Sequence, residues 1–207
     1  MVTKLKKLNI CVFASGGGSN FNSLIAARRN NVFKSEIKLL ITNNSNCGAV
    51  DIAKINKIAY FHISRKVFPR LTDDDYQKLF LDKLTEFGID LILLAGYMKL
   101  IEPLVVRHFR NRIINIHPAL LPLFGGKGMY GINVHKAVIT SGARTSGLTI
   151  HLVNENYDKG RILLQKNVTV EDEDDENSLQ QKILNLEHLY YSKVIRDIEL
   201  GKIKLDE

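Results

Sequence analysis

Short apolar runs alternate with segments of helical periodicity over the first part of the chain. The runs are typical of buried strands, and the apolar positions between them recur at helical spacing. The predicted strands cover residues 8–14, 37–42, 58–63, 89–94 and 112–116, and the predicted helices cover residues 21–29, 49–56, 72–87 and 104–109. This order predicts a doubly wound α/β fold with a mostly parallel, Rossmann-like sheet.

The pattern changes after Pro118. A loop over residues 124–131 contains four glycines and leads into a predicted helix around 135–140. Two further strands separated by a turn predict an antiparallel pair near the C-terminus, and a long helix follows. These strands cover residues 148–153 and 162–170, and the last helix covers 178–200. Because we find no repeat or linker, we expect a single domain over residues 1–207.

The net charge of +7 does not by itself identify a partner. The lysines are scattered, and no basic stripe with interleaved aromatic residues is visible, so we expect no nucleic-acid partner. Attraction of anionic small molecules and plain solubility are the other two explanations of the charge.

Composition also bounds the compartment. No apolar run approaches the roughly 18 residues that a membrane span needs, so we expect no membrane partner. The apolar stretch 10–14 follows basic residues, but it is too short for the core of a signal peptide. Cys11 and Cys47 show neither disulfide-framework nor metal-ligand spacing. These features predict a cytoplasmic protein.

The first candidate site is the turn at residues 15–20, which reads Ser-Gly-Gly-Gly-Ser-Asn between a predicted strand and a helix. Such a turn lets backbone N–H groups approach an anion at the helix N-terminus. Phe21 stands where a dinucleotide fingerprint needs its third glycine, and the P-loop lysine is absent. The turn therefore predicts a cradle for a phosphate on a molecule smaller than a dinucleotide. A tight turn without a ligand is the alternative.

The second candidate site is the strand end at Asn115 and His117. Residues two apart on a strand point to the same face, and open α/β sheets bind ligands at the carboxyl ends of their strands. Asn115 could bind the oxyanion that forms at a carbonyl group, and His117 could supply or relay a proton. A polar strand end capped by hydrogen bonds is the alternative.

The third candidate is the turn 154–160, which carries Asp158. If Asp158 lies near His117, its negative charge should raise the histidine pKa above the usual value of about 6.5. A plain Asn/Asp/Gly turn is the alternative. The acidic run 171–176 predicts a solvated loop, because consecutive carboxylates do not converge on one metal ion.

The remaining histidines have no obvious partners in the sequence. We expect three of them, His62, His108 and His188, to be structural or exposed. Neither His135 nor His151 makes a metal pair with His117 at a common ligand spacing. No metal site is therefore predicted.

Several segments together resemble the folate-dependent formyltransferases. Residues 115–122 resemble the family's Asn-x-His-Pro-Ser/Ala-Leu-Leu-Pro signature, and residues 94–99 resemble its folate-binding segment. The turn at Asp158 and the strand after it resemble its Asp-x-Gly turn. The similarity covers essentially the whole chain, and the first motif is highly specific.

This resemblance implies a transfer of a formyl group from 10-formyltetrahydrofolate to an amine. The chain has no room for the extra domain of the tRNA-modifying or deformylating members. It is therefore similar to the branch that formylates 5-phosphoribosylglycinamide in purine synthesis, as a monomer or homodimer. A deformylase would share the same triad but use water, and a non-enzymatic binding module would have no use for the triad.

The resemblance also implies roles for individual residues. It implies that Asn115, His117 and Asp158 are catalytic. It implies that Gly18, Ser19, Asn20 and Glu187 hold the acceptor, and that Met98, Lys99, Leu100, Ile101, Asn115 and the loop 154–158 line the folate site. Two features depart from the family: Arg70 is only a loose counterpart of a folate-contacting arginine, and the loop 124–131 is longer and richer in glycine.

Overall fold

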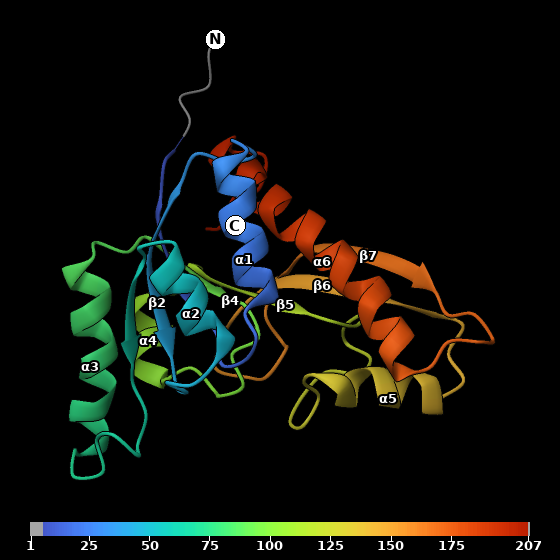
Figure 1. The fold of residues 1–207 in the computed structure, drawn as a ribbon, viewed down its shortest axis with the longest axis horizontal. Coiled ribbons are helices and arrows are strands. Elements are labelled where there is room, and N and C mark those ends of the chain that lie inside the picture. The colour runs from blue at the N-terminus through green and yellow to red at the C-terminus, as the bar shows by residue number, and fades with distance from the viewer. Residues whose placement is uncertain (1–5, 207) are drawn as a thin grey trace.

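Within residues 6–206, which this computed structural model describes, seven strands form one sheet in the order β3-β2-β1-β4-β5-β6-β7 (Figure 1). The strands are β1 (Asn9–Phe13), β2 (Glu36–Thr42), β3 (Ala59–His62), β4 (Leu91–Leu94), β5 (Ile113–His117), β6 (Thr145–Leu152) and β7 (Ile162–Thr169). The first five pair in parallel, whereas β6 pairs antiparallel with both β5 and β7. The predicted fold class is confirmed. Residues 1–5 and 207 of the predicted domain lie outside the described residues.

Helices cover both faces of the sheet. They are α1 (Ser19–Arg29), α2 (Gly48–Ile55), α3 (Asp73–Glu86), α4 (Pro103–His108), α5 (Ile132–Thr140) and α6 (Glu176–Glu199). Successive residues of β1 point to opposite faces, so Ile10 and Val12 pack with α1, α2 and α6, while Cys11 and Phe13 pack with α3 and α4. This two-sided burial explains why the central strands are apolar at nearly every position.

Most element boundaries differ from the prediction by one to three residues. The strand β6 begins at Thr145 and not at Leu148, because Gly147 interrupts the apolar run in the sequence. A Cβ atom at Gly147 would overlap the carbonyl oxygen of Lys166 on β7, so a glycine is required for close pairing of the two strands. The helix α5 begins at Ile132, and α6 begins at Glu176 after the capping residue Asp175.

The acidic run 171–176 is partly structural. The Asp175 side chain accepts the backbone N–H groups of Asn177 and Ser178, which caps α6. Asp174 Oδ2 lies 2.5 Å from Lys182 Nζ, and this ion pair, chiefly, lowers the Asp174 pKa to about 2. The run therefore lies in a loop before the final helix, as predicted, and two of its residues also stabilise the start of that helix.

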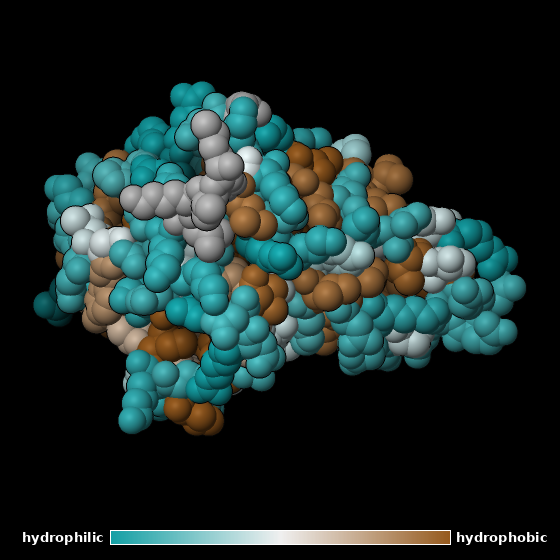
Figure 2. All heavy atoms as spheres, turned by 90° about the horizontal axis from the view of Figure 1, so that it is seen from above, coloured by the Kyte–Doolittle hydropathy of each residue, from teal (hydrophilic) through white to brown (hydrophobic). Residues whose placement is uncertain are grey.

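The order of the strands reverses between β1 and β4. From β1 the chain adds β2 and β3 on one side of the sheet, and it then returns to add β4 and β5 on the other side. In doubly wound sheets a ligand crevice opens beside the carboxyl ends of the strands at such a position. The face seen from above is largely hydrophilic, with hydrophobic residues in smaller groups (Figure 2). No described helix is long and apolar enough to cross a membrane.

Candidate active site

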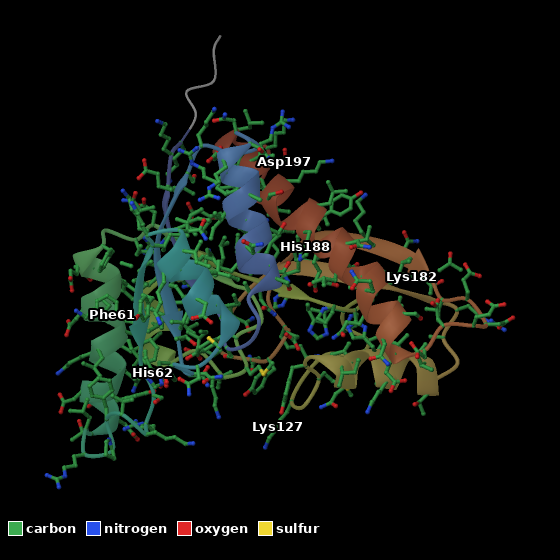
Figure 3. All side chains as sticks on the ribbon, in the orientation of Figure 1. Phe61, His62, Lys127, Lys182, His188 and Asp197 are labelled. Atoms are coloured by element: carbon green, nitrogen blue, oxygen red, sulfur yellow. The ribbon has the colours of Figure 1, made fainter. Side chains whose placement is uncertain are left out.

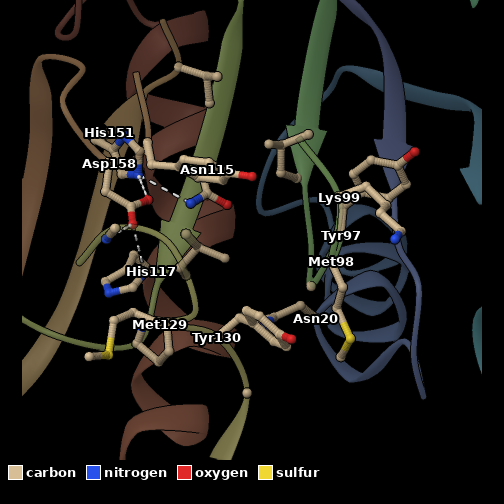
Figure 4. Close-up of a pocket in the computed structure, with 18 of the residues that line it drawn as sticks. Asn20, Tyr97, Met98, Lys99, Asn115, His117, Met129, Tyr130, His151 and Asp158 are labelled. Carbon is tan, nitrogen blue, oxygen red and sulfur yellow. Dashed lines mark hydrogen bonds and ion pairs between the residues drawn. The ribbon is translucent and has the colours of Figure 1, made fainter. Parts of the chain in front are cut away.

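A pocket of about 700 Å³ opens beside the carboxyl ends of β4 and β5 (Figure 4). Its walls come from the first turn of α1, the segment after β4, the loop 124–131, β6, the turn after β6 and α6. Ten predicted site residues line it: Ser19, Asn20, Met98, Lys99, Leu100, Ile101, Asn115, His117, Asp158 and Glu187. The structure thus brings together residues that the sequence separates by up to 168 positions, from Ser19 to Glu187.

Two predicted site residues do not line this pocket. Gly18 precedes α1 with a φ of +79°, and a Cβ atom there would lie 2.9 Å from the Cα of Ala49. Gly18 therefore shapes the turn by its backbone conformation and by its close contact with α2. Arg70 lies in an exposed turn between β3 and α3. Its predicted contact with folate stays a prediction.

Asn115 is oriented by a histidine on the neighbouring strand. The antiparallel pairing of β5 with β6 places Asn115 opposite His151, and Asn115 Nδ2 lies 3.1 Å from His151 Nε2. The other ring nitrogen, Nδ1, donates to the Leu152 carbonyl at 2.8 Å. These two contacts fix the His151 ring, so that one N–H of the Asn115 amide faces Nε2. The second N–H of Asn115 is left for a ligand.

Asp158 connects the two histidines. One carboxylate oxygen lies 3.5 Å from His151 Nε2, and the other lies 3.9 Å from His117 Nδ1. The second oxygen also accepts the Gly126 N–H at 2.7 Å. Burial raises the Asp158 pKa. The contact with His151, the hydrogen bond from Gly126 and the nearby His117 together lower it by more, so the net pKa is below its ordinary value. Asp158 is therefore ionised at neutral pH.

The predicted rise in the His117 pKa was wrong. The ring is buried, and burial lowers its pKa more than the Asp158 charge and the contact with Phe124 raise it. Since His117 Nε2 donates to the Phe124 carbonyl at 2.8 Å, the neutral ring keeps its lone pair on Nδ1, toward Asp158. At neutral pH His117 can accept a proton there, and Asp158 stabilises the resulting charge.

A second buried carboxyl group lies on the α1 side of the pocket. Asn20 Nδ2 donates to Glu187 Oε2 at 2.7 Å, and both residues are nine-tenths or more buried. Burial raises the Glu187 pKa to about 7, although the Asn20 hydrogen bond lowers it. Ser19 remains exposed at the helix start, where first-turn N–H groups lack partners within the helix. This end of the pocket combines free donors with a partly neutral acid.

The segment after β4 forms the apolar wall. Met98 and Leu100 are about half exposed, at 49% and 46%, and both line the pocket. Ser15 fixes this segment, because its hydroxyl accepts the Met98 N–H at 2.9 Å and donates to Asn43 Oδ1 at 2.5 Å. The wall can pack against a flat, largely apolar ligand.

Two histidines in the pocket were missed by the sequence reasoning. His151 was set aside because it has no metal-ligand spacing, yet it orients Asn115. His135 on α5 also lines the pocket, and burial with the nearby His117 lowers its pKa to about 4. Thr149 and His151 alternate along β6, and this spacing could have indicated that both side chains lie on one face of the strand. By contrast, His188 lies on α6 beside α1, whereas Lys127 on the loop 124–131 lines the pocket (Figure 3).

The arrangement suits chemistry at a carbonyl carbon. It offers an amide donor for developing negative charge, a neutral imidazole for a proton and a carboxylate to stabilise the imidazolium. Within residues 6–206, no group of three His, Cys, Asp or Glu side chains could hold a metal ion.

Comparison with known proteins identifies relatives over nearly the whole chain. The sequence model of the formyl transferase family matches residues 8–195. Over 206 residues, the chain is 44% identical to a chloroplastic phosphoribosylglycinamide formyltransferase of Arabidopsis thaliana, covering 98% of this chain and 69% of that protein. Its likeness to the enzyme of the same name from Vigna unguiculata is also 44%, over 92% of this chain and 61% of that protein. The chain thus spans about two thirds of these plant proteins.

A solved structure agrees with these relatives. The crystal structure of phosphoribosylglycinamide formyltransferase from Anaplasma phagocytophilum superposes with a TM-score of 0.85 at 34% identity. The match covers 96% of this chain and 90% of that one. Both the sheet and the pocket-forming segments therefore fall within the shared region.

Proposed function

Because this chain belongs to the formyl transferase family, we propose that it transfers a formyl group from 10-formyltetrahydrofolate to the amine of 5-phosphoribosylglycinamide, a step of purine synthesis. The observation that carries this proposal is the convergence of Asn115, His117 and Asp158 on one pocket. That pocket has an apolar wall on one side and a helix N-terminus on the other, so it offers separate places for a folate and a phosphorylated acceptor.

In the proposed mechanism the acceptor amine attacks the formyl carbon directly. The new C–N bond forms as the carbonyl oxygen becomes negative, and the second N–H of Asn115 donates to that oxygen. His117 Nδ1 accepts the proton that the amine loses, and Asp158 stabilises the imidazolium. The bond from the carbon to the folate nitrogen then breaks, and the proton returns to that nitrogen. The remaining contribution is positioning of the two substrates.

We assign the substrates to opposite ends of the pocket. Ser19, Asn20 and Glu187 hold the acceptor on a turn shaped by Gly18, and its phosphate lies against the first turn of α1. The folate lies along the wall formed by Met98, Lys99, Leu100 and Ile101 and contacts the turn 154–158. We propose one such domain over residues 1–207, acting as a monomer or homodimer in the cytoplasm without nucleic-acid or membrane partners. The names of the plant relatives specify chloroplasts, so fractionation of the tagged chain should test the compartment.

The direct test is a turnover assay with both substrates. Tetrahydrofolate and the formylated acceptor should appear in equal amounts, as measured by absorbance and mass spectrometry. Omitting the acceptor should stop tetrahydrofolate release. Release at an unchanged rate without the acceptor would mean that water attacks the formyl carbon, and the chain would then be a deformylase.

Ser19→Ala should weaken the acceptor selectively. A hydrogen bond to a charged group contributes roughly 1.5–3 kcal/mol, so we expect the KM of the acceptor to rise about 10-fold or more. The KM of the folate should stay within twofold. The exposed Ser45, outside the pocket, offers a matched control as Ser45→Ala. An increase in the folate KM instead would contradict the assignment of this end of the pocket.

The basic charge should give only weak nucleic-acid binding. Without a basic stripe, few phosphates can be neutralised at once, so any affinity for duplex DNA should fall steeply with salt. Fluorescence anisotropy with a labelled duplex at 50 and 150 mM salt measures this. Tight binding at the higher salt concentration would contradict the proposal of small-molecule substrates alone.

A further inference from the structure

The loop 124–131 is attached to the proposed catalytic residues. His117 donates to the carbonyl of Phe124, and Asp158 accepts the N–H of Gly126. Within the loop, the Met129 N–H bonds to the Gly126 carbonyl at 3.1 Å, and the Tyr130 N–H bonds to the Gly128 carbonyl at 3.2 Å. The position of the loop relative to the pocket is therefore set by the same side chains that perform the proposed chemistry.

Tyr130 projects from this loop along the pocket. The residue is 52% exposed, and it lines the pocket together with Ser19 and Asn20. In the view of Figure 4 the Tyr130 side chain extends in the direction of Asn20 and Met98, which also line the pocket. No hydrogen bond joins its hydroxyl to a described residue. A large aromatic residue held at a pocket edge with a free hydroxyl is suited to a ligand contact.

We propose that Tyr130 is a specificity-determining residue for the acceptor, and that its hydroxyl donates a hydrogen bond to the phosphate at the first turn of α1. This inference rests on the proposed function and deepens it. The loop would then form a second wall of the phosphate site, opposite Ser19.

Charge and exposure place the phosphate at the outer end of the pocket. Glu187 lies at the buried end, and with a pKa of about 7 it is partly ionised at neutral pH. A phosphate beside it would be repelled and would also lose its hydration. Ser19 and Tyr130 are both exposed, so a phosphate between them keeps partial contact with water. Lys127 belongs to the same loop and also lines the pocket, so a positive charge lies on the Tyr130 side of the site.

Tyr130→Phe removes only the hydroxyl and tests the inference directly. The readout is kcat/KM for 5-phosphoribosylglycinamide and for the same acceptor without its phosphate. Loss of a hydrogen bond to a charged group should lower the ratio of these two values about 10-fold. The inhibition constant of inorganic phosphate, measured against the acceptor, should rise by a similar factor, and the KM of the folate should not change.

Tyr157→Phe provides the matched control for phosphate selectivity. Tyr157 also lines the pocket and is 47% exposed, but it lies in the turn after β6 on the folate side. Its substitution should leave the ratio between the two acceptors unchanged. Thermal unfolding of each variant should show that the fold is retained.

The outcomes separate failure of the inference from failure of the proposed function. If the unsubstituted protein forms no formylated acceptor, the proposed function itself is wrong. If that protein is active but Tyr130→Phe lowers kcat/KM equally for both acceptors, or changes only the folate KM, the phosphate contact is wrong. An unchanged ratio with an unchanged inhibition constant for phosphate overturns the inference as well.

Discussion

Replacing Asn115 with alanine should lower turnover by about 100-fold or more, because loss of one oxyanion donor typically costs this much. The amide is held at 3.1 Å from His151, so its second N–H is oriented before a substrate arrives. An oriented donor needs no reorganisation when charge develops on the formyl oxygen. The effect should therefore fall on kcat, and folate binding should remain largely intact. Steady-state kinetics and folate titration by fluorescence measure the two quantities.

Two further variants distinguish a lost donor from a lost side chain. Asn115→Asp keeps the size but replaces the N–H₂ group by an oxygen, so it should be at least as impaired as the alanine variant. Asn167→Ala removes an exposed asparagine from the neighbouring part of the sheet and should retain normal turnover. Near-normal turnover in Asn115→Ala would end the oxyanion role.

The strands of the sheet were predictable because most of them are buried on two faces. The strand β4 is apolar and buried at all four positions, so its sequence admits few other interpretations. Where a local requirement overrides the apolar pattern, the prediction was wrong. Gly147 lies inside β6 because only a glycine permits the close approach of β7, but in the sequence it looks like an interruption.

The candidate site was predictable only in part. The two-residue spacing of Asn115 and His117 follows from strand geometry, and both residues line the pocket as expected. The contribution of His151 depends on the antiparallel register between β5 and β6, which no local sequence signal specifies. The direction of the His117 pKa shift depends on the balance between burial and the Asp158 charge. A motif can suggest the charge but not the extent of burial.

The variant Asp158→Asn should lower turnover by roughly 10²–10⁴-fold, the range typical of general acid–base contributions. It should also lower the His117 pKa below its already depressed value, because the Asp158 charge is the main factor that raises it. The substituted side chain should fit the fold, since Asp158 has a φ of +52° and asparagine tolerates this left-handed region well. An asparagine oxygen can still accept the Gly126 N–H. The substitution therefore removes a charge with little change in shape.

The sign of the pH dependence follows from the neutral state of His117. If His117 accepts the amine proton, activity falls at low pH as the ring becomes protonated, and the acid limb should move to lower pH in Asp158→Asn. The acceptor amine has an acid limb of its own, so the His117 titration should be followed separately by NMR in the free protein. The variant Asp82→Asn, which removes an exposed carboxylate from α3, should change neither quantity. A collapse of turnover with an unmoved His117 titration would mean that Asp158 acts through an ordered water and not through its charge on His117. Normal turnover with an unmoved titration would exclude Asp158 from the mechanism.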